Sequence, residues 1–167
     1  MSGWAALLRA VNVSGTGKLP MAELKALCEE LGLGQVRTYI ASGNVVFASE
    51  RSESEIRDAI AAALLERYGK PIGVQVCSAA ELAELAAGNP WPERPGNRVV
   101  AIFVDDPLSL DGITGQRGEV VQLGNRAIYV DFAEGQADSR LRIPCAKAGT
   151  ARNMNTVGKL AEMASEL

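Results

Sequence analysis

A chain of 167 residues, 47% hydrophobic and 22% charged, has the composition of an average globular protein that buries one core or two small ones. Its net charge of −3 argues against non-specific nucleic-acid binding, which requires a dense cationic face. Without histidine, a Ser-His-Asp or Cys-His mechanism is excluded. The widely spaced Cys28, Cys77 and Cys145 argue against a disulfide framework or an ordinary zinc site, so we expect buried thiols and no metal or cofactor.

The apolar start of the chain does not have the features of an export signal. Residues 1–11 lack a basic region and a small-residue cleavage site, and we interpret them as a strand. No apolar stretch approaches the roughly 18 residues that a membrane span requires. Reduced cysteines fit the cytosol. We therefore expect a soluble cytoplasmic protein with no membrane partner.

In chain order, the first elements are a strand, a helix and a hairpin. Residues 4–8 form a continuous apolar run, which is typical of a central strand buried on both faces. Apolar residues at helical spacing predict a helix over 20–31, with a proline at its first position and Gly32 at its left-handed end. The β-rich residues 36–47 contain the tight turn Ser42-Gly43-Asn44 and predict a hairpin.

A second helix and a fourth strand complete the first half of the chain. Ser52 and Glu55 form a capping box at the start of a helix over 52–64, and residues 72–77 alternate as a strand does. The order is βαββαβ, which is ferredoxin-like. In that arrangement strand 4–8 runs parallel to strand 36–40, and the strand that begins at residue 45 returns between them.

The next segment predicts a short helix and then a boundary. Ser78 and Glu81 form a second capping box, and the helix that they begin stops at Gly88. Residues 89–96 are rich in proline and other helix-breaking residues, so they form the best internal boundary of the chain.

The last third of the chain repeats the first half in outline, with its final strand either missing or not recognisable from the sequence. Residues 99–104 form an apolar strand, and residues 120–132 form a hairpin around Gly124-Asn125. Residues 138–143 are interpreted as a short helix. Thr150 is expected to cap the last helix.

These elements predict an α+β fold with two subdomains. Residues 1–78 form the ferredoxin-like βαββαβ subdomain, and residues 79–96 form the helix and proline-rich connector. Residues 97–167 form the second subdomain, a related antiparallel sheet with helices on one face, ending in a helix.

Four stretches carry a resemblance to a known family: ALLRAVNV (6–13), KLPMAEL (18–24), TYIASGNVVF (38–47) and TARNMNTV (150–157). In these, and so over nearly its whole length, the chain resembles the domain-of-unknown-function 1697 family. The family usually has glycine in place of Ala10 and Ser14, and tryptophan in place of Met154, so this chain has a less permissive loop and one aromatic surface fewer. The resemblance implies an α+β fold with ferredoxin-like subdomains and no established reaction.

The predicted topology brings the end of the first strand, the glycine-rich loop after it and the hairpin turn to one edge of the sheet. The candidate ligand-binding residues at this edge are Arg9, Asn12, Ser14, Gly15, Gly17, Lys18, Ser42, Gly43 and Asn44. We place Arg152, Asn153 and Asn155 in the first turn of the last helix and expect them to pack against the same edge.

This set of residues suits an anion. Glycines let backbone N–H groups converge on one point, a helix N-terminus adds partial positive charge, and the arginines and lysine supply full charges. The sequence therefore predicts binding of a small phosphate- or nucleotide-containing ligand. Three alternatives stay open: a nucleic-acid or protein interaction module without catalytic activity, purely structural loop roles for the same residues, and catalysis by positioning and electrostatics. The sequence assigns neither an enzymatic activity nor an oligomeric state.

Overall fold

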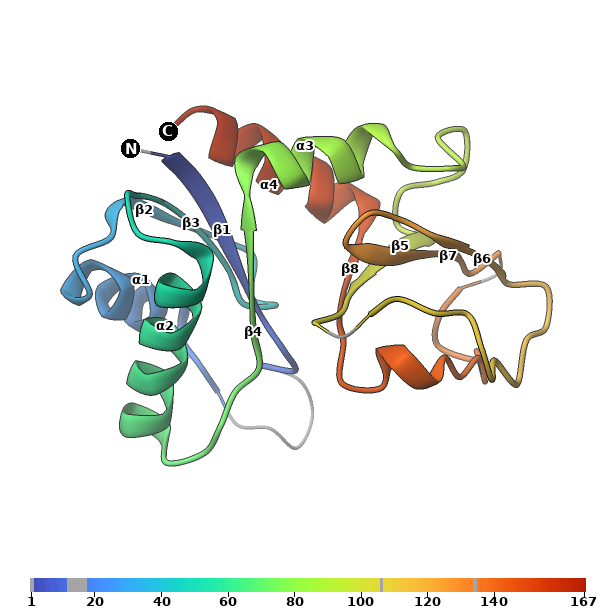
Figure 1. The fold of residues 1–167 in the computed structure, drawn as a ribbon, viewed down its shortest axis with the longest axis horizontal. Helices are drawn as coiled ribbons and strands as arrows, with labels where there is room; N and C mark the ends of the chain where they lie inside the picture. The colour runs from blue at the N-terminus through green and yellow to red at the C-terminus, as the bar shows by residue number, and fades with distance from the viewer. Residues whose placement is uncertain (1, 12–17, 106, 134) are drawn as a thin grey trace. The chain divides into compact units, whose positions relative to one another are not determined.

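The computed structural model describes residues 2–11, 18–105, 107–133 and 135–167 of the chain (Figure 1). The chain divides into two compact units: unit 1 consists of Met1–Leu82 with Leu160–Leu167, and unit 2 of Ala83–Lys159. The described strands form two four-stranded antiparallel sheets accompanied by helices, which confirms the α+β class. The subdomain boundaries expected from the sequence stay a prediction.

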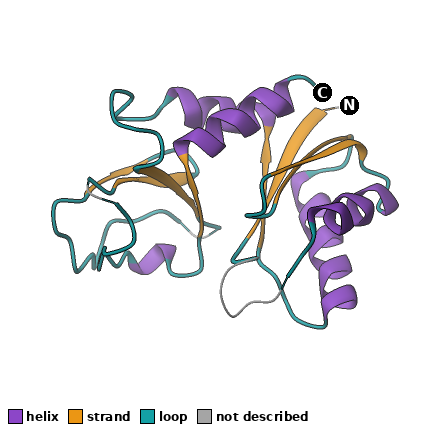
Figure 2. Cartoon of the chain, turned by 180° about the vertical axis from the view of Figure 1, so that it is seen from behind, coloured by secondary structure: helices purple, strands orange, loops and turns teal. Residues whose placement is uncertain are grey.

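Unit 1 has the βαββαβ order that the sequence predicts. Its elements are β1 (Ser2–Leu8), α1 (Met21–Glu30), β2 (Gly34–Tyr39), β3 (Asn44–Ser49), α2 (Glu53–Tyr68) and β4 (Val74–Ser78). The sheet order is β2-β3-β1-β4, and β3 is antiparallel to both β1 and β2. Helices α1 and α2 lie on the same face of this sheet in both views (Figures 1 and 2).

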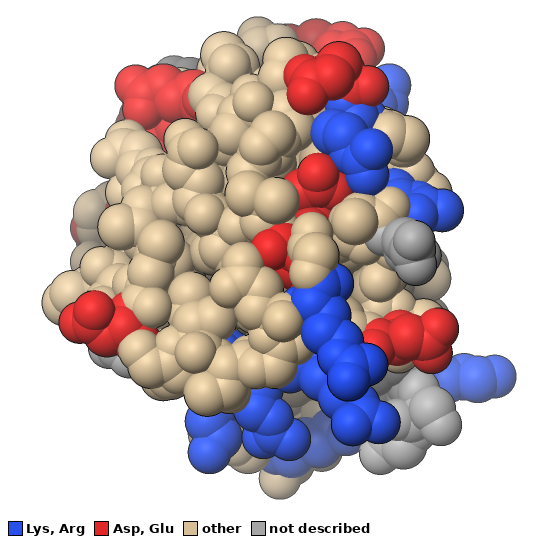
Figure 3. All heavy atoms as spheres, turned by 90° about the vertical axis from the view of Figure 1, so that its right-hand side faces the viewer, with Lys and Arg blue, Asp and Glu red and all other residues tan. Residues whose placement is uncertain are grey.

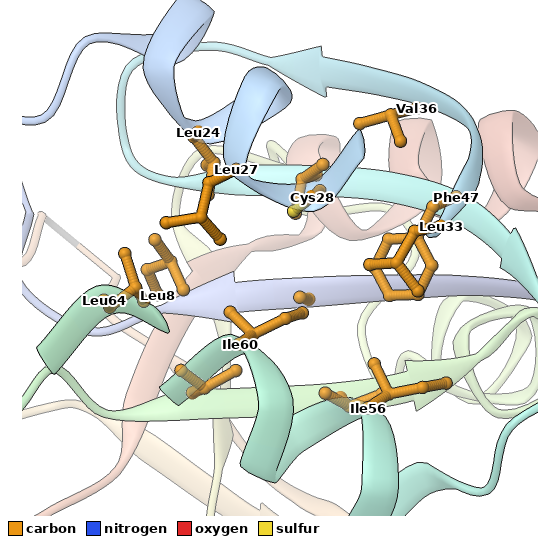
Figure 4. Packing of buried hydrophobic residues seen from close by; sticks show 14 of the residues in the cluster. Leu8, Leu24, Leu27, Cys28, Leu33, Val36, Phe47, Ile56, Ile60 and Leu64 are labelled. Carbon is orange, nitrogen blue, oxygen red and sulfur yellow. The ribbon is translucent and has the colours of Figure 1, made fainter. Parts of the chain in front are cut away.

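The hydrophobic core of unit 1 lies between this sheet and its two helices (Figure 4). Leu24 and Cys28 of α1 and Ile56 and Ile60 of α2 pack in one cluster with Phe47 of β3, and all five side chains are fully buried. Burial raises the pKa of the Cys28 thiol to about 12, so this cysteine is an inert core residue.

Unit 2 repeats the strand order of unit 1. Its strands are β5 (Val99–Phe103), β6 (Val120–Leu123), β7 (Ala127–Asp131) and β8 (Thr150–Asn153), in the order β6-β7-β5-β8. Strand β5 therefore takes the place that β1 has in the first sheet. Helix α3 (Ala79–Ala87) precedes this sheet in the chain, and α4 (Met154–Ser165) follows it. On one face of the sheet, the Tyr129 hydroxyl donates a hydrogen bond of 2.8 Å to the Leu85 carbonyl of α3.

The predicted helix over residues 138–143 is wrong. Arg142 pairs with Thr114 instead, through two backbone hydrogen bonds of 2.8 and 3.1 Å. A single 3₁₀ turn, Pro144–Ala146, follows. The segment is therefore drawn into an extended pairing that its local sequence does not indicate.

The predicted start of the last helix is also wrong. Thr150 does not cap α4, because Thr150–Asn153 forms β8, the final strand that the sequence pattern missed. The helix is capped by Asn153, whose side-chain oxygen accepts a hydrogen bond of 3.0 Å from the Thr156 N–H. Arg152 and Asn153 therefore lie on a strand, and of the three signature residues Asn155 alone lies in the first turn of α4.

No helix in the described parts of the chain combines the length and hydrophobicity that a membrane span requires. Within the same residues, no group of three or more histidine, cysteine, aspartate or glutamate side chains is placed to hold a metal ion.

Glu119 links the two long connections of unit 2, the β5–β6 and β7–β8 connections. Its buried carboxylate accepts hydrogen bonds of 2.5 Å from the Ser139 hydroxyl and from the Arg117 N–H. The Ser139 hydrogen bond, followed by that of Arg117, lowers the pKa of Glu119 because both favour the ionised form.

Replacing Glu119 by glutamine should make unit 2 less sensitive to acid. A carboxylate with a lowered pKa stabilises the fold above its unfolded-state pKa, and this stabilisation is lost as the pH falls through the folded-state value. The free energy of unfolding of Glu119→Gln should therefore fall less steeply than that of the wild type between about pH 5 and pH 3, measured by urea unfolding. Glu93→Gln removes an exposed carboxylate of the same unit and serves as the control. Equal slopes for Glu119→Gln and the wild type would contradict the assignment.

Candidate functional site

The end of β1 adjoins the hairpin turn and the segment before β4. The Leu8 N–H donates a 2.8 Å hydrogen bond to the Gly43 carbonyl, and the Arg9 N–H donates a 2.9 Å hydrogen bond to the Gly73 carbonyl. These two bonds bring three segments that are distant in the sequence to one end of the first sheet. We refer to this place as the β1 edge.

The side chains of Leu8 and Val11 pack so closely against the backbone at position 43 that a glycine is required there. Gly43 has φ +90°, and a Cβ there would lie 2.5 Å from Val11 Cγ2 and 3.0 Å from Leu8 Cβ. Ala10 also has a positive φ, of 53°, which glycine adopts without strain. The glycine that the family resemblance expects at position 10 therefore has a conformational reason.

Asn44 stabilises the hairpin turn from within. Its fully buried side chain donates hydrogen bonds from Nδ2 to the Tyr39 carbonyl at 3.0 Å and to the Ser42 hydroxyl at 2.9 Å. Both amide hydrogens are thus used inside the turn. Arg9 and Lys18, by contrast, are exposed, so a ligand can reach both of these predicted residues.

A small hollow of about 40 Å³ lies at the β1 edge, lined by Ala10, Lys18 and Lys70 among others. Tyr68, which also lines it, donates its hydroxyl to a Glu23 carboxylate oxygen at 2.5 Å. Burial, followed by this hydrogen bond, raises the pKa of Tyr68 to about 12. The sequence analysis missed Lys70, because a lysine after a helix-ending glycine belongs to no motif.

Four of the predicted ligand-binding residues, Asn12, Ser14, Gly15 and Gly17, lie outside the described residues. Their place in a ligand site stays a prediction.

The three C-terminal candidates belong to unit 2, and their association with the β1 edge also stays a prediction. Arg152 is buried, donates to the Ala151 carbonyl at 2.9 Å, and has its pKa lowered to about 10 by that burial. Asn155 packs against Gly96, where a Cβ would lie 2.1 Å from the Asn155 side-chain oxygen. Together with the helix cap formed by Asn153, these contacts give each of the three C-terminal candidates a structural role inside unit 2.

Comparisons with known proteins support the fold and name no activity. A family model described as a protein of unknown function, DUF1697, matches residues 1–129. The solved structure of the conserved bacterial protein SP0830 from Streptococcus pneumoniae is similar to this chain, with 26% sequence identity, a TM-score of 0.79 and 98% of each chain covered. No curated protein matches.

Substituting Gly43 by alanine should destabilise unit 1 strongly, because an added methyl group meets Leu8 and Val11 at a positive φ. We expect a loss of about 2–4 kcal/mol in the free energy of unfolding, measured with urea. Gly69→Ala is the matched control, since Gly69 also has a positive φ of 72° but no atom within 4 Å of an added Cβ. That variant should lose about 1 kcal/mol. Similar losses in the two variants would show that packing at the β1 edge is not tight.

Proposed function

We propose that this chain, which belongs to the DUF1697 family of proteins of unknown function, binds a small phosphate- or carboxylate-bearing ligand at the β1 edge. The observation that carries the proposal is the presence of two exposed lysines, Lys18 and Lys70, in the lining of one hollow, with the exposed Arg9 next to that lining in the chain. Lys18 and Lys70 line this hollow directly. Arg9 precedes Ala10 of the lining, and a Cβ on Gly73 would lie 3.2 Å from its Cβ.

The size of the hollow suits one charged group of a ligand. A volume of about 40 Å³ accommodates a single oxyanion group, whereas a whole nucleotide would extend beyond it into solvent. None of the described residues that line the hollow is a carboxylate. The nearby Glu23 carboxylate accepts the Tyr68 hydroxyl and keeps its negative charge. Lys18 and Lys70 together outweigh this one carboxylate, so the charge of these residues is positive in a chain whose net charge is −3.

Nucleic-acid binding is the less favoured alternative because aromatic side chains of the first sheet are buried or partly buried. Phe47 is fully buried in the core, and Trp4 is partly buried and donates its indole N–H to the Ser49 carbonyl at 3.3 Å. Base stacking on a sheet requires exposed aromatic rings. Binding of a phosphate group on a small molecule does not require exposed aromatic rings.

Removing the lysine charges should weaken anion binding at the β1 edge. We expect Lys18→Met and Lys70→Met each to lower the affinity for inorganic pyrophosphate about two- to fivefold, since exposed charge pairs contribute modestly. The double variant should lose more, and raising the salt from 20 to 200 mM should weaken wild-type binding further. Isothermal titration calorimetry measures all of these affinities.

Lys25→Met removes one exposed lysine from α1 and controls for the change in net charge. Pyrophosphate affinity that is equal in the double variant and the control would refute the proposal. If a ten-nucleotide single-stranded RNA bound more tightly than pyrophosphate at the same salt concentration, the nucleic-acid alternative would be favoured.

A further inference from the structure

The two sheets share one strand order but are covered differently. In unit 1, the connection after β1 contains α1 and the connection after β3 contains α2. In unit 2, the corresponding β5–β6 connection has no helix among its described residues, and the β7–β8 connection has a single 3₁₀ turn. Loop residues such as Leu110, Ile113 and Leu141 therefore pack over the apolar face that carries Val100 and Ile128.

These loops line a cavity of about 570 Å³ that opens to solvent, and its volume lies within the size range of small-molecule sites. Its apolar wall includes Ile102 of β5 with Phe132 and Ile143, the last two of which are buried. Arg142 and Lys147 line it as exposed cations. No carboxylate is present among the described residues of the lining.

The cavity walls are held by specific contacts. Thr114 and Arg142, both in the lining, exchange two backbone hydrogen bonds across the loops. The Cys145 thiol donates to the Ser109 carbonyl at 3.1 Å. Gly115 packs so closely that a Cβ there would lie 1.9 Å from the Arg140 carbonyl oxygen. The loops are therefore fixed to one another in an arrangement that leaves the space open.

A neighbouring hollow carries charges of both signs. This hollow of about 420 Å³ shares Phe132 and Ser139 with the cavity and adds exposed Arg117 and Arg140. Of its carboxylates, Glu119 is buried and accepts hydrogen bonds from within the loops, while Asp138 is exposed. On the face of the molecule drawn in Figure 3, lysine and arginine side chains gather toward the lower edge.

We propose that the unit 2 cavity is a second binding site, for a small organic anion that joins an apolar ring to a carboxylate or phosphate. The ring would pack against Ile102 and Phe132, where burial of apolar surface supplies affinity. The oxyanion would meet Arg142 and Lys147, whose positive charges select against neutral rings. This proposal is independent of the β1 edge, since all of these residues belong to unit 2.

Titration calorimetry with the full chain and four probes tests the proposal: phenyl phosphate, benzoate, benzamide and inorganic phosphate. Phenyl phosphate or benzoate should bind saturably, and the stronger of the two identifies the preferred oxyanion. Benzamide lacks the charge and inorganic phosphate lacks the ring, so each should bind about tenfold more weakly than the preferred probe. Absence of saturable binding by both ring anions up to about 10 mM would overturn the proposal, as would equal binding of benzamide.

Variants place the binding in the cavity. Arg142→Met should weaken the preferred ring anion about tenfold and Lys147→Met about threefold, because methionine keeps an apolar stem of similar length and removes the charge. Lys25→Met should leave this affinity unchanged. In nuclear magnetic resonance spectra, the amide signals of Ile102, Phe132 and Ile143 should shift on binding. Shifts confined to the β1 edge, or full affinity in Arg142→Met, would refute the cavity as the site while leaving the first proposal standing.

Discussion

Each sheet of this protein has an apolar face that must be shielded from water, and what shields it decides where a ligand can bind. In unit 1 the shield consists of two helices whose apolar faces interdigitate with the sheet. Leu24, Ile60 and Phe47 have no exposed surface there, so the described core is filled with its own side chains. The ligand proposed for unit 1 therefore lies outside this core, at the end of the sheet where β1, the hairpin turn and the segment before β4 meet.

In unit 2 the same strand order is covered by loops, and loops fill space in a different way. Their backbone groups need partners that a helix would supply internally, so they bond across to one another. Thr114 pairs with Arg142, and the Gln116 side chain donates to the Glu119 carbonyl at 2.6 Å. The conformation of these loops is therefore set by the hydrogen bonding of their polar groups and not by the shape of the sheet surface that they cover. The cavity beside Ile102 is what this shield leaves unfilled.

Local signals in the sequence predicted most of the fold. Both capping boxes, Ser52 with Glu55 and Ser78 with Glu81, form as expected, because their geometry is fixed within four residues. Strand β8 was missed because Thr150–Asn153 has the polar pattern of a helix start, and only its pairing with β5 makes it a strand. The candidate site residues also divide into those that local sequence indicates and those that depend on contacts between distant segments. Arg9 was predicted because it ends the first strand, and Lys18 because its loop leads into the first helix. Lys70, Arg142 and Lys147, by contrast, line these two places only through contacts between distant segments.

The side chains at these two places suit recognition of an oxyanion. The chain has no histidine, and the described residues that line the β1 hollow and the cavity combine lysine or arginine with tyrosine or neutral polar side chains, without a carboxylate. Lysine and arginine can hold an oxyanion through charge-assisted hydrogen bonds. The two places also differ in how they would hold it. At the β1 edge the attraction is almost wholly electrostatic and therefore screened by salt, while in the cavity an apolar wall adds a contribution that salt does not screen. A ligand with a ring would therefore favour the cavity, and a bare phosphate group would have no reason to.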